Sequence, residues 1–232
     1  MFNKQHRETT EDLFLLQEYG VDVKSRTVYL MGEFGGECDS VETALTNLRH
    51  LSSSEHYPND YLKPIKLLID SPGGDDIVMF HLYDFMTTCL TPIHTIGIGE
   101  VCSAAALILA AGEKGHRSAT PNCMYMTHKG KSGLGGDDDE IEAQAAMQAL
   151  NSDKYWRLLE RHTLDKDTGL GLTASQWLSK SKHKGELWLN VEQMLAFGVI
   201  DSVIPTAKEW PALSTKKLRT RVKEVEVDED DD

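Results

Sequence analysis

The sequence contains few cysteines and no long hydrophobic run. Its 232 residues include four cysteines, Cys38, Cys89, Cys102 and Cys123, and their wide spacing matches neither a zinc-binding pattern nor a disulfide framework. No apolar run is long enough to span a bilayer, and no secretory signal peptide is recognisable. These absences predict a protein of the reducing cytoplasm that has no metal centre and no membrane-embedded part.

Basic residues are fewer than acidic residues. The chain has 24 Lys and Arg against 37 Asp and Glu, which gives a formal net charge of −13 at pH 7. Binding of nucleic acid requires a concentrated basic surface, but the only basic cluster, residues 216–223, directly precedes an acidic end. The charge balance therefore argues against a nucleic-acid partner, while 40% hydrophobic residues suffice for the core of one sizeable domain.

The most informative stretch is residues 96–128. Its first part, Ile96 to Gly99, is apolar and predicts a buried strand, and the Ala- and Leu-rich run from Ala104 to Ala111 predicts a buried helix. Ser103 would then lie between the strand and the helix. The first amides of a helix have no partner within it and its dipole is positive there, so an oxygen nucleophile at Ser103 and the oxyanion it creates would lie beside free donors.

His128 is the candidate base for Ser103. A serine hydroxyl is a weak nucleophile at neutral pH and requires a base within hydrogen-bond reach. The alternating segment from Asn122 to Thr127 predicts a strand that runs beside the first one and leads into His128. The alternative interpretation is that Ser103 only caps a helix and that His128 belongs to a surface loop.

Two neighbouring features have alternative interpretations of their own. Cys102 is a second candidate nucleophile, but adjacent strand residues point to opposite faces, which favours a packed core thiol. The glycine-rich run 129–136 superficially resembles a phosphate-binding loop. It lacks the strand, Gly-x-x-x-x-Gly-Lys-Ser/Thr and helix order of such loops, so a flexible connection is expected.

A buried strand at residues 67–70 ends in the turn Ser71-Pro72-Gly73-Gly74, which exposes backbone N–H groups. Gly74 lies 29 positions before Ser103, and His128 lies 25 positions after it. After this turn follow Gly-x-x-x-Ser at Ser103, then Ala-Ala-Gly-x-Lys-Gly-x-Arg, then Pro-Asn, and finally Met-x-His at His128. With four motifs in order, roughly residues 26–204 resemble the proteolytic subunit of the Clp protease, ClpP.

The resemblance implies roles for individual residues. Ser103 would be the nucleophile and His128 the general base of a serine endopeptidase, with the amides of Gly74 and Ala104 as the oxyanion hole. It also implies an α/β fold of the ClpP/crotonase type, built from repeated β-β-α units with a protruding handle helix. Acyl-enzyme chemistry of this kind needs no metal and no organic cofactor.

The resemblance further implies a self-compartmentalised, ATP-dependent protease. Its subunits would form a homo-oligomer of two stacked heptameric rings, a tetradecamer that encloses the active sites. An AAA+ unfoldase, which uses the ATP, would feed unfolded polypeptides into the chamber. Two alternatives stay open: a catalytically impaired structural subunit of the ClpP type, and a crotonase-type acyl-CoA enzyme, which shares the fold but needs no Ser/His pair.

The third member of the catalytic triad does not carry over by position. In the family an Asp precedes the strand that leads into a Glu-Ala-x-x-x-Gly-x-x-Asp signature, which corresponds here to residues 188–201. The positions where this Asp should fall hold Lys180, Lys182 and Lys184. The candidate replacements are Glu186, Asp165 and Asp167. Without any of these, Ser103 and His128 would work as a dyad. The chain also departs from the family at Asp75-Asp76 and at Lys129-Gly130.

Elsewhere the pattern predicts alternating strands and helices. The expected elements are a strand at 26–32, a helix from 39 or 40 to 51, a loop at 52–64, a strand at 65–69, a helix at 76–90 and a strand at 93–98. Such strand-crossover-strand units predict a parallel sheet with helices on it.

The sequence predicts one protease-like domain at residues 26–205 with a segment at each end. Residues 1–25 are expected to be a mobile extension or a short helix, which by the resemblance lines an axial entrance. Residues 137–161 have an acidic start and an apolar stripe, which predicts the long handle helix. Residues 206–232 are acidic at their end and are expected to be a disordered tail.

Overall fold

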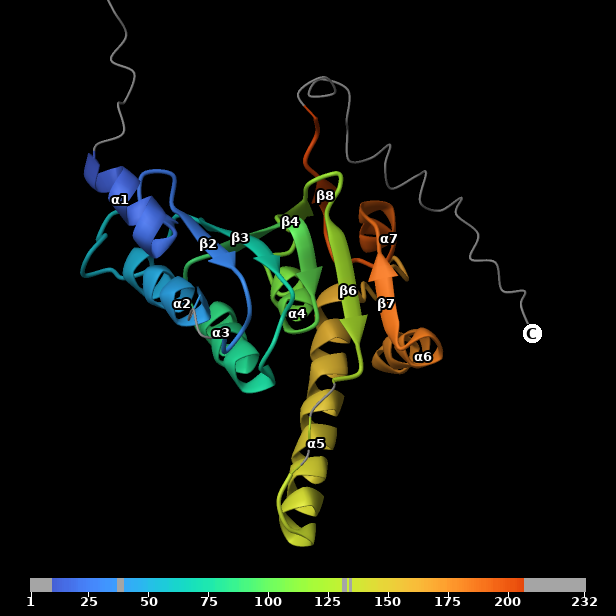
Figure 1. Cartoon of the computed structure of the whole chain (residues 1–232). Coiled ribbons are helices and arrows are strands. Elements are labelled where there is room, and N and C mark those ends of the chain that lie inside the picture. Colours follow the sequence, from blue (N-terminus) through green and yellow to red (C-terminus); the bar gives the residue numbers. More distant parts are fainter. Residues whose placement is uncertain (1–9, 37–39, 131–132, 134, 207–232) are drawn as a thin grey trace, which may run out of the picture.

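The computed structural model describes residues 10–36, 40–130, 133 and 135–206, and for residues 182–184 it describes only the backbone. An eight-stranded, mostly parallel sheet with helices packed against it forms the fold (Figure 1). The strands are β1 (Val21–Asp22), β2 (Thr27–Met31), β3 (Ile65–Ser71), β4 (Ile93–Cys102), β5 (Ser118–Ala119), β6 (Met124–His128), β7 (Glu186–Leu189) and β8 (Ser202–Val203). The predicted α/β class is confirmed.

The helices predicted between residues 39 and 161 lie close to their expected positions, whereas the helices at residues 174–184 and 191–196 were not predicted. They are α1 (Thr10–Tyr19), α2 (Ser40–Leu51), α3 (Asp76–Thr88), α4 (Ala104–Ala110), α5 (Asp138–Thr163), α6 (Ala174–Lys184) and α7 (Val191–Ala196). All seven residues of α4 are buried, and the helix packs against β4, α3 and α5. Its alanines allow this close approach, and the packing fixes the position of Ser103 between β4 and α4.

Strand β4 changes its sheet partner along its length. Along one edge it pairs with β3, up to Val101 opposite Ser71, and along the other edge it pairs first with β5 and then, at residues 100–102, with β6. Gly99 lies between the two parts with a φ of +57°, and a Cβ there would lie 2.6 Å from Oδ1 of Asp70, so this position requires glycine. Strand β6, with its antiparallel partner β7, therefore leaves the main sheet and carries His128 past the end of β4.

Residues 10–25 belong to the folded domain. Of the two alternatives for the N-terminal segment, the short helix is present as α1, and β1 pairs antiparallel with β2. Val21 is buried in the core cluster, so the fold begins before the predicted boundary at Arg26. The expectations for residues 1–9 and for the tail from residue 207 onward fall outside the described residues.

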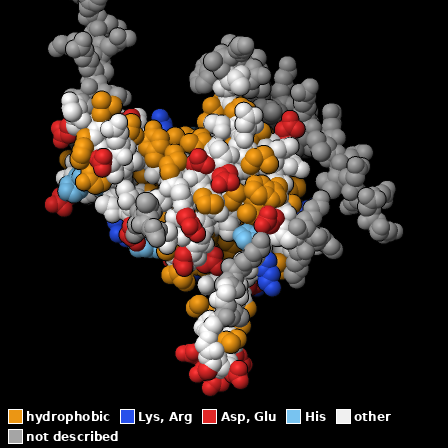
Figure 2. Space-filling model, in the orientation of Figure 1, with side chains coloured by type: hydrophobic (Ala, Val, Ile, Leu, Met, Phe, Trp, Pro, Cys, Tyr) orange, Lys and Arg blue, Asp and Glu red, His pale blue; other side chains and the backbone are white. Residues whose placement is uncertain are grey.

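Helix α5 extends far beyond the body of the molecule (Figure 1). Asp137 caps it, accepting a hydrogen bond from the Glu140 amide within a capping box, and Figure 2 shows acidic side chains gathered over this projecting end. Met147 and Leu150 are exposed, whereas Tyr155 is buried against the domain. Within the described ranges, no helix combines the length and the apolarity that crossing a membrane requires.

A buried ion pair between Arg117 and Asp201 lies near the C-terminal end of α4. The guanidinium of Arg117 donates to both carboxylate oxygens of Asp201, at 2.9 Å and 2.8 Å, and also to the carbonyls of Ala110 and His162. Burial alone would raise the pKa of Asp201, but the hydrogen bonds and the charge of Arg117 outweigh it and lower the pKa. Arg117 thus joins the C-terminal ends of α4 and α5 to the strand edge at β8.

Candidate active site

Ser103 occupies a strained turn between β4 and α4. Its φ of 54° is in a region that residues other than glycine rarely adopt. The backbone is held there because its N–H donates to the Met126 carbonyl at 2.8 Å and its carbonyl accepts from the Tyr155 hydroxyl at 3.1 Å. The Ser103 side chain makes no capping hydrogen bond to α4. The turn therefore presents the hydroxyl for another partner, unlike a helix cap.

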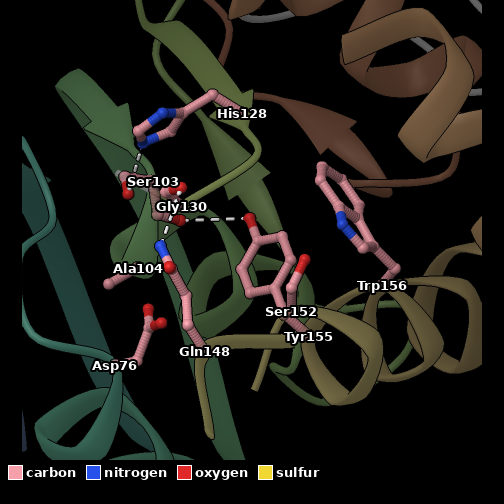
Figure 3. Close-up of a pocket in the computed structure, with 9 residues that line it drawn as sticks. All are labelled: Asp76, Ser103, Ala104, His128, Gly130, Gln148, Ser152, Tyr155 and Trp156. Atoms are coloured by element: carbon pink, nitrogen blue, oxygen red, sulfur yellow. Dashed lines mark hydrogen bonds between the residues drawn. The ribbon is translucent and has the colours of Figure 1, made fainter. Parts of the chain in front are cut away.

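That partner is His128. Because β6 runs parallel to the end of β4, with Met126 opposite Cys102, the chain reaches His128 just beyond Ser103. The His128 Nε2 atom lies 2.8 Å from Ser103 Oγ, as Figure 3 shows. The structure thus brings together the two side chains that the sequence paired, and this distance suits transfer of the hydroxyl proton to the imidazole.

The turn after β3 approaches Ser103 very closely. A Cβ on Gly73 would lie 2.5 Å from the Cys102 carbonyl oxygen and 2.7 Å from the Ser103 Cβ. Only glycine fits at this distance, and the φ of +92° at Gly73 also favours it. The first glycine of the Gly73-Gly74 pair therefore allows the end of β3 to lie against the serine.

The two amides predicted as an oxyanion hole have no acceptor in the part of the chain that the structure describes. The carbonyl of Gly73 and the amide of Asp75 pair with Phe34, at 2.7 Å and 3.0 Å, so the Gly74 amide points to the other side of the strand. The Ala104 amide is the first of α4 and has no partner within that helix. Both donors are thus available to an added oxygen atom.

Cys102 is a core residue. It is 3% exposed, and burial, with added repulsion from Glu100 and Glu186, raises the pKa of its thiol to about 12. A thiol in this state is not ionised at neutral pH and is a poor nucleophile.

The structure shows that Tyr155 supports the Ser103 turn, which the sequence reading missed. Its buried hydroxyl lies 2.9 Å from Thr127 Oγ1 and donates to the Ser103 carbonyl. The sequence pattern placed Tyr155 on the apolar stripe of a long helix, and the only signal for another role was that this residue carries a hydroxyl on that stripe. The result is that α5 is tied directly to the serine turn.

A partly enclosed pocket opens beside the Ser103 hydroxyl. Its cavity volume is about 20 Å³, which is room for roughly one water molecule. The residues that line it besides Ser103 and His128 are Asp76, Ala104, Gly130, Gln148, Ser152, Tyr155 and Trp156 (Figure 3). Asp76 is at the position where the sequence departs from the family, and the prediction gave it no role.

Among the candidate acids, Glu186 lies nearest to the expected place. It is directly opposite His128 in the antiparallel pairing of β6 with β7, so the two side chains share one face of the ribbon. Its carboxylate also accepts a hydrogen bond from Trp188 Nε1 at 3.2 Å. The structure therefore makes Glu186 the candidate for the third position.

Asp165 and Asp167 lie elsewhere. Asp165 pairs with Lys114 at 3.1 Å and accepts from the Asp167 amide in its own turn. Lys114 follows Glu113, whose amide bonds to Ile93 at the beginning of β4, about 30 Å of strand away from Ser103. The structure does not bring these two acids to His128. Of the lysines at the expected positions, Lys180 lies near the Phe197 ring, and the side chains of residues 182 and 184 are outside the described part.

No cluster of His, Cys, Asp or Glu among the described residues is suited to hold a metal ion. The glycine-rich segment after His128 is partly outside the described residues. Its described part includes Gly130, whose carbonyl accepts from Gln148 Nε2 at 3.3 Å. The chemical groups at the site are therefore a hydroxyl, an imidazole, two amides and two nearby carboxylates, which suit acyl transfer.

Comparisons with known proteins identify the family of the chain. A model of the Clp protease family matches residues 15–207. The chain is 30% identical over 209 residues to a Treponema denticola protein named ATP-dependent Clp protease proteolytic subunit 2, with 90% of this chain and 94% of the relative aligned. It is 28% identical to proteolytic subunit 1 of Rhodopirellula baltica, with 88% of this chain and 79% of the relative aligned. These matches confirm the resemblance seen in the motifs, and the chain belongs to the Clp protease family.

Proposed function

We propose that this protein is a serine endopeptidase subunit in which Ser103 is the nucleophile and His128 the general base. The observation that carries the proposal is the 2.8 Å contact between Ser103 Oγ and His128 Nε2, beside two amides that have no acceptor in the described chain. A capping serine or a packing histidine would need neither the strained turn nor this contact.

In the first step, Ser103 Oγ attacks the carbonyl carbon of a peptide bond while His128 Nε2 takes the hydroxyl proton. The carbonyl oxygen becomes an oxyanion, which the amides of Gly74 and Ala104 stabilise by hydrogen bonds that form as the charge develops. His128 then gives its proton to the departing amine, and an acyl-enzyme on Ser103 remains.

In the second step, a water molecule attacks the acyl-enzyme with His128 again taking a proton. The acid is released, and the proton returns to Ser103. Throughout, the imidazole must present Nε2 to Ser103 and must be stabilised when it becomes an imidazolium. We assign that role to Glu186, because it shares a ribbon face with His128.

The proposed working form is a cytoplasmic homo-oligomer of two stacked heptameric rings that degrades unfolded polypeptides delivered by an ATP-dependent AAA+ unfoldase. The names of the relatives and the exposed apolar residues Met147 and Leu150 on projecting α5 support it. Light scattering should show a large assembly, and a 25.9 kDa species at every protein concentration would contradict it.

The test of the chemistry is Ser103→Ala. This variant should lose peptidase activity by about 10⁴-fold or more and should lose labelling by a serine-directed fluorophosphonate, while its assembly stays intact. Ser152→Ala removes the second serine among the residues that line the pocket and should retain the label. Cleavage by Ser103→Ala at the wild-type rate would overturn the assignment.

A further inference from the structure

The outer face of the β6–β7 ribbon carries apolar side chains beside His128. In β6, Tyr125 and Thr127 are fully buried toward the core. Because successive strand residues point to opposite faces, Met124, Met126 and His128 share the other, outer face. Figure 2 shows apolar side chains gathered over β6 and β7 on this side of the molecule. The imidazole thus lies at one end of an apolar surface.

Strand β7 adds an aromatic ring to this surface. Trp188 lies opposite Met126, just as Glu186 lies opposite His128, and side chains of directly opposed residues share a face. Trp188 is 45% exposed and Met124 is 40% exposed, whereas Met126 between them is buried. These three residues form an apolar patch, and its two exposed members offer a ligand apolar surface that the described chain leaves uncovered.

The Trp188 ring is tied toward the His128 end of the ribbon. Its Nε1–H donates to the Glu186 carboxylate at 3.2 Å. The diagonal between His128 and Trp188 on such a ribbon is about 7–8 Å, which a large side chain of a bound peptide can span. Glu100 lies opposite Met124 in the pairing of β4 with β6. Carboxylates therefore border the apolar patch at both ends, and they disfavour an acidic ligand.

The chemistry of acyl transfer determines which part of a substrate meets this patch. The amides of Gly74 and Ala104 would hold the attacked carbonyl, and the pocket beside Ala104 has room for roughly one water molecule. That pocket admits no large side chain. On the other side of the scissile bond, the departing amine must meet His128 to receive its proton. The residue that follows the scissile bond therefore begins at the imidazole, from which the ribbon face leads to Trp188.

We propose that the apolar patch binds the side chain of the substrate residue that follows the scissile bond, and that Trp188 determines a preference for large apolar side chains at this position. The proposal rests on the proposed peptidase function, because only acyl transfer at Ser103 brings a departing amine to His128. It places substrate selection on the amine side of the bond.

The test measures how the acyl-enzyme partitions between water and an added amine. A peptide linked to a fluorogenic amine acylates Ser103 and releases the dye, and water or an amino acid amide then attacks the acyl carbon. With the amide, a C–N bond forms, the bond from the acyl carbon to Ser103 Oγ breaks, and the amine proton passes through His128 to Ser103. The ratio of peptide amide to peptide acid, from mass spectrometry, reports binding on the amine side, because both products come from the same acyl-enzyme.

The wild-type ratio should be about tenfold higher with phenylalaninamide than with glycinamide at equal concentration, as burial of a large apolar side chain provides. Trp188→Ala should reduce this selectivity to less than about threefold. Trp188→Phe keeps an aromatic surface and should retain most of the selectivity, although it removes the hydrogen bond to Glu186. A change in the rate of acylation alone leaves the ratio unaffected.

Leu90→Ala is the matched control. Leu90 is 80% exposed and precedes β4, whose ten residues separate it from Ser103, so this variant should keep the wild-type selectivity. Equal ratios for the two amides in the wild type would overturn the proposal. So would unchanged selectivity in Trp188→Ala, or an equal loss in Trp188→Phe, which would mean that the ring acts through Glu186.

The same experiment separates this proposal from the peptidase function. If Ser103 is acylated and the two amides are not discriminated, only the role of the apolar patch fails. If no acyl-enzyme forms on Ser103, the peptidase function fails and takes the proposal with it.

Discussion

Two carboxylates at opposite ends of α4 differ in how completely the fold satisfies them. Beyond the C-terminal end, Asp201 accepts hydrogen bonds from the Arg117 guanidinium and from the amides of Gly115 and Arg117, and its pKa is lowered. Near the N-terminal end, Asp76 faces the pocket of Ser103, and its pKa is raised by burial. The same chemical group has a full set of partners at one end and no cationic partner among the described residues at the other.

The difference shows which of the two charges the fold itself stabilises. The attraction between Arg117 and Asp201 is realised when the chain folds, so it contributes to stability and nothing further to binding. No cation of the described chain pairs with Asp76, so ionisation of this half-buried carboxylate opposes folding. Substitutions at the two ends should therefore separate stability from activity.

The largest expected effect is at the structural end. Arg117→Met removes the cation from the buried carboxylate of Asp201, which keeps only backbone amide donors, and it also removes a donor from two helix-end carbonyls. This should lower the free energy of unfolding by about 3–5 kcal/mol. Chemical denaturation measures it. Lys114→Met breaks the exposed pair with Asp165 and should cost less than about 1 kcal/mol. Equal losses in both variants would remove the distinction between buried and exposed pairs here.

At the reactive end, Glu186→Gln should lower kcat/KM by about a hundredfold with little change in stability. The amide keeps the shape of the carboxylate but cannot stabilise an imidazolium at His128. The double variant Asp165→Asn with Asp167→Asn is the control, since these acids lie at the far end of β4. If neither change affects turnover, Ser103 and His128 act as a dyad.

A pair of tyrosines allows a finer comparison. The Tyr83 hydroxyl bonds to His162 Nε2 at 2.8 Å near the structural end, and the Tyr155 hydroxyl bonds at the serine turn. Burial and nearby arginines lower the pKa of His162 to about 4, so the ring that makes this bond is neutral at pH 7. Both Tyr→Phe variants should lose about 1–2 kcal/mol of stability. Only Tyr155→Phe should also lower kcat, and similar kinetics in the two variants would contradict the support of Ser103 by Tyr155.

The smallest effect is the pH dependence of stability at Asp76. Its pKa in the folded state is raised, so ionisation opposes folding; this cost is absent below the unfolded pKa of about 3.8 and fully present above the folded pKa. Asp76→Asn should therefore have a higher thermal midpoint than the wild type at pH 7 and the same midpoint at pH 3, by calorimetry. The sign is opposite at Asp201, whose lowered pKa contributes stability that is lost as the pH falls through it. A lower midpoint for Asp76→Asn at pH 7 would show that a cation already pairs with it.

The sequence predicted the features that depend on short segments. Ser103 and His128 were found because a strand, a turn and a helix follow one another along the chain, and their spacing fits a parallel pair of strands. Glu186 stayed one candidate among several, because its place depends on the pairing of β7 with β6. Asp76 and the Tyr155 hydroxyl were missed, because only the crossing of α5 over the site gives them a common environment.

Helix α5 connects the pocket beside Ser103 with the projecting end of the molecule. One face of this helix lines the pocket with Gln148, Ser152 and Tyr155. Ile141 lies about 16 Å from Ser152 along the helix axis, toward the projecting end. A helix transmits displacement along its length because its backbone hydrogen bonds resist bending. The helix that projects from the domain therefore also supplies a wall of the pocket and the hydroxyl that holds the Ser103 turn.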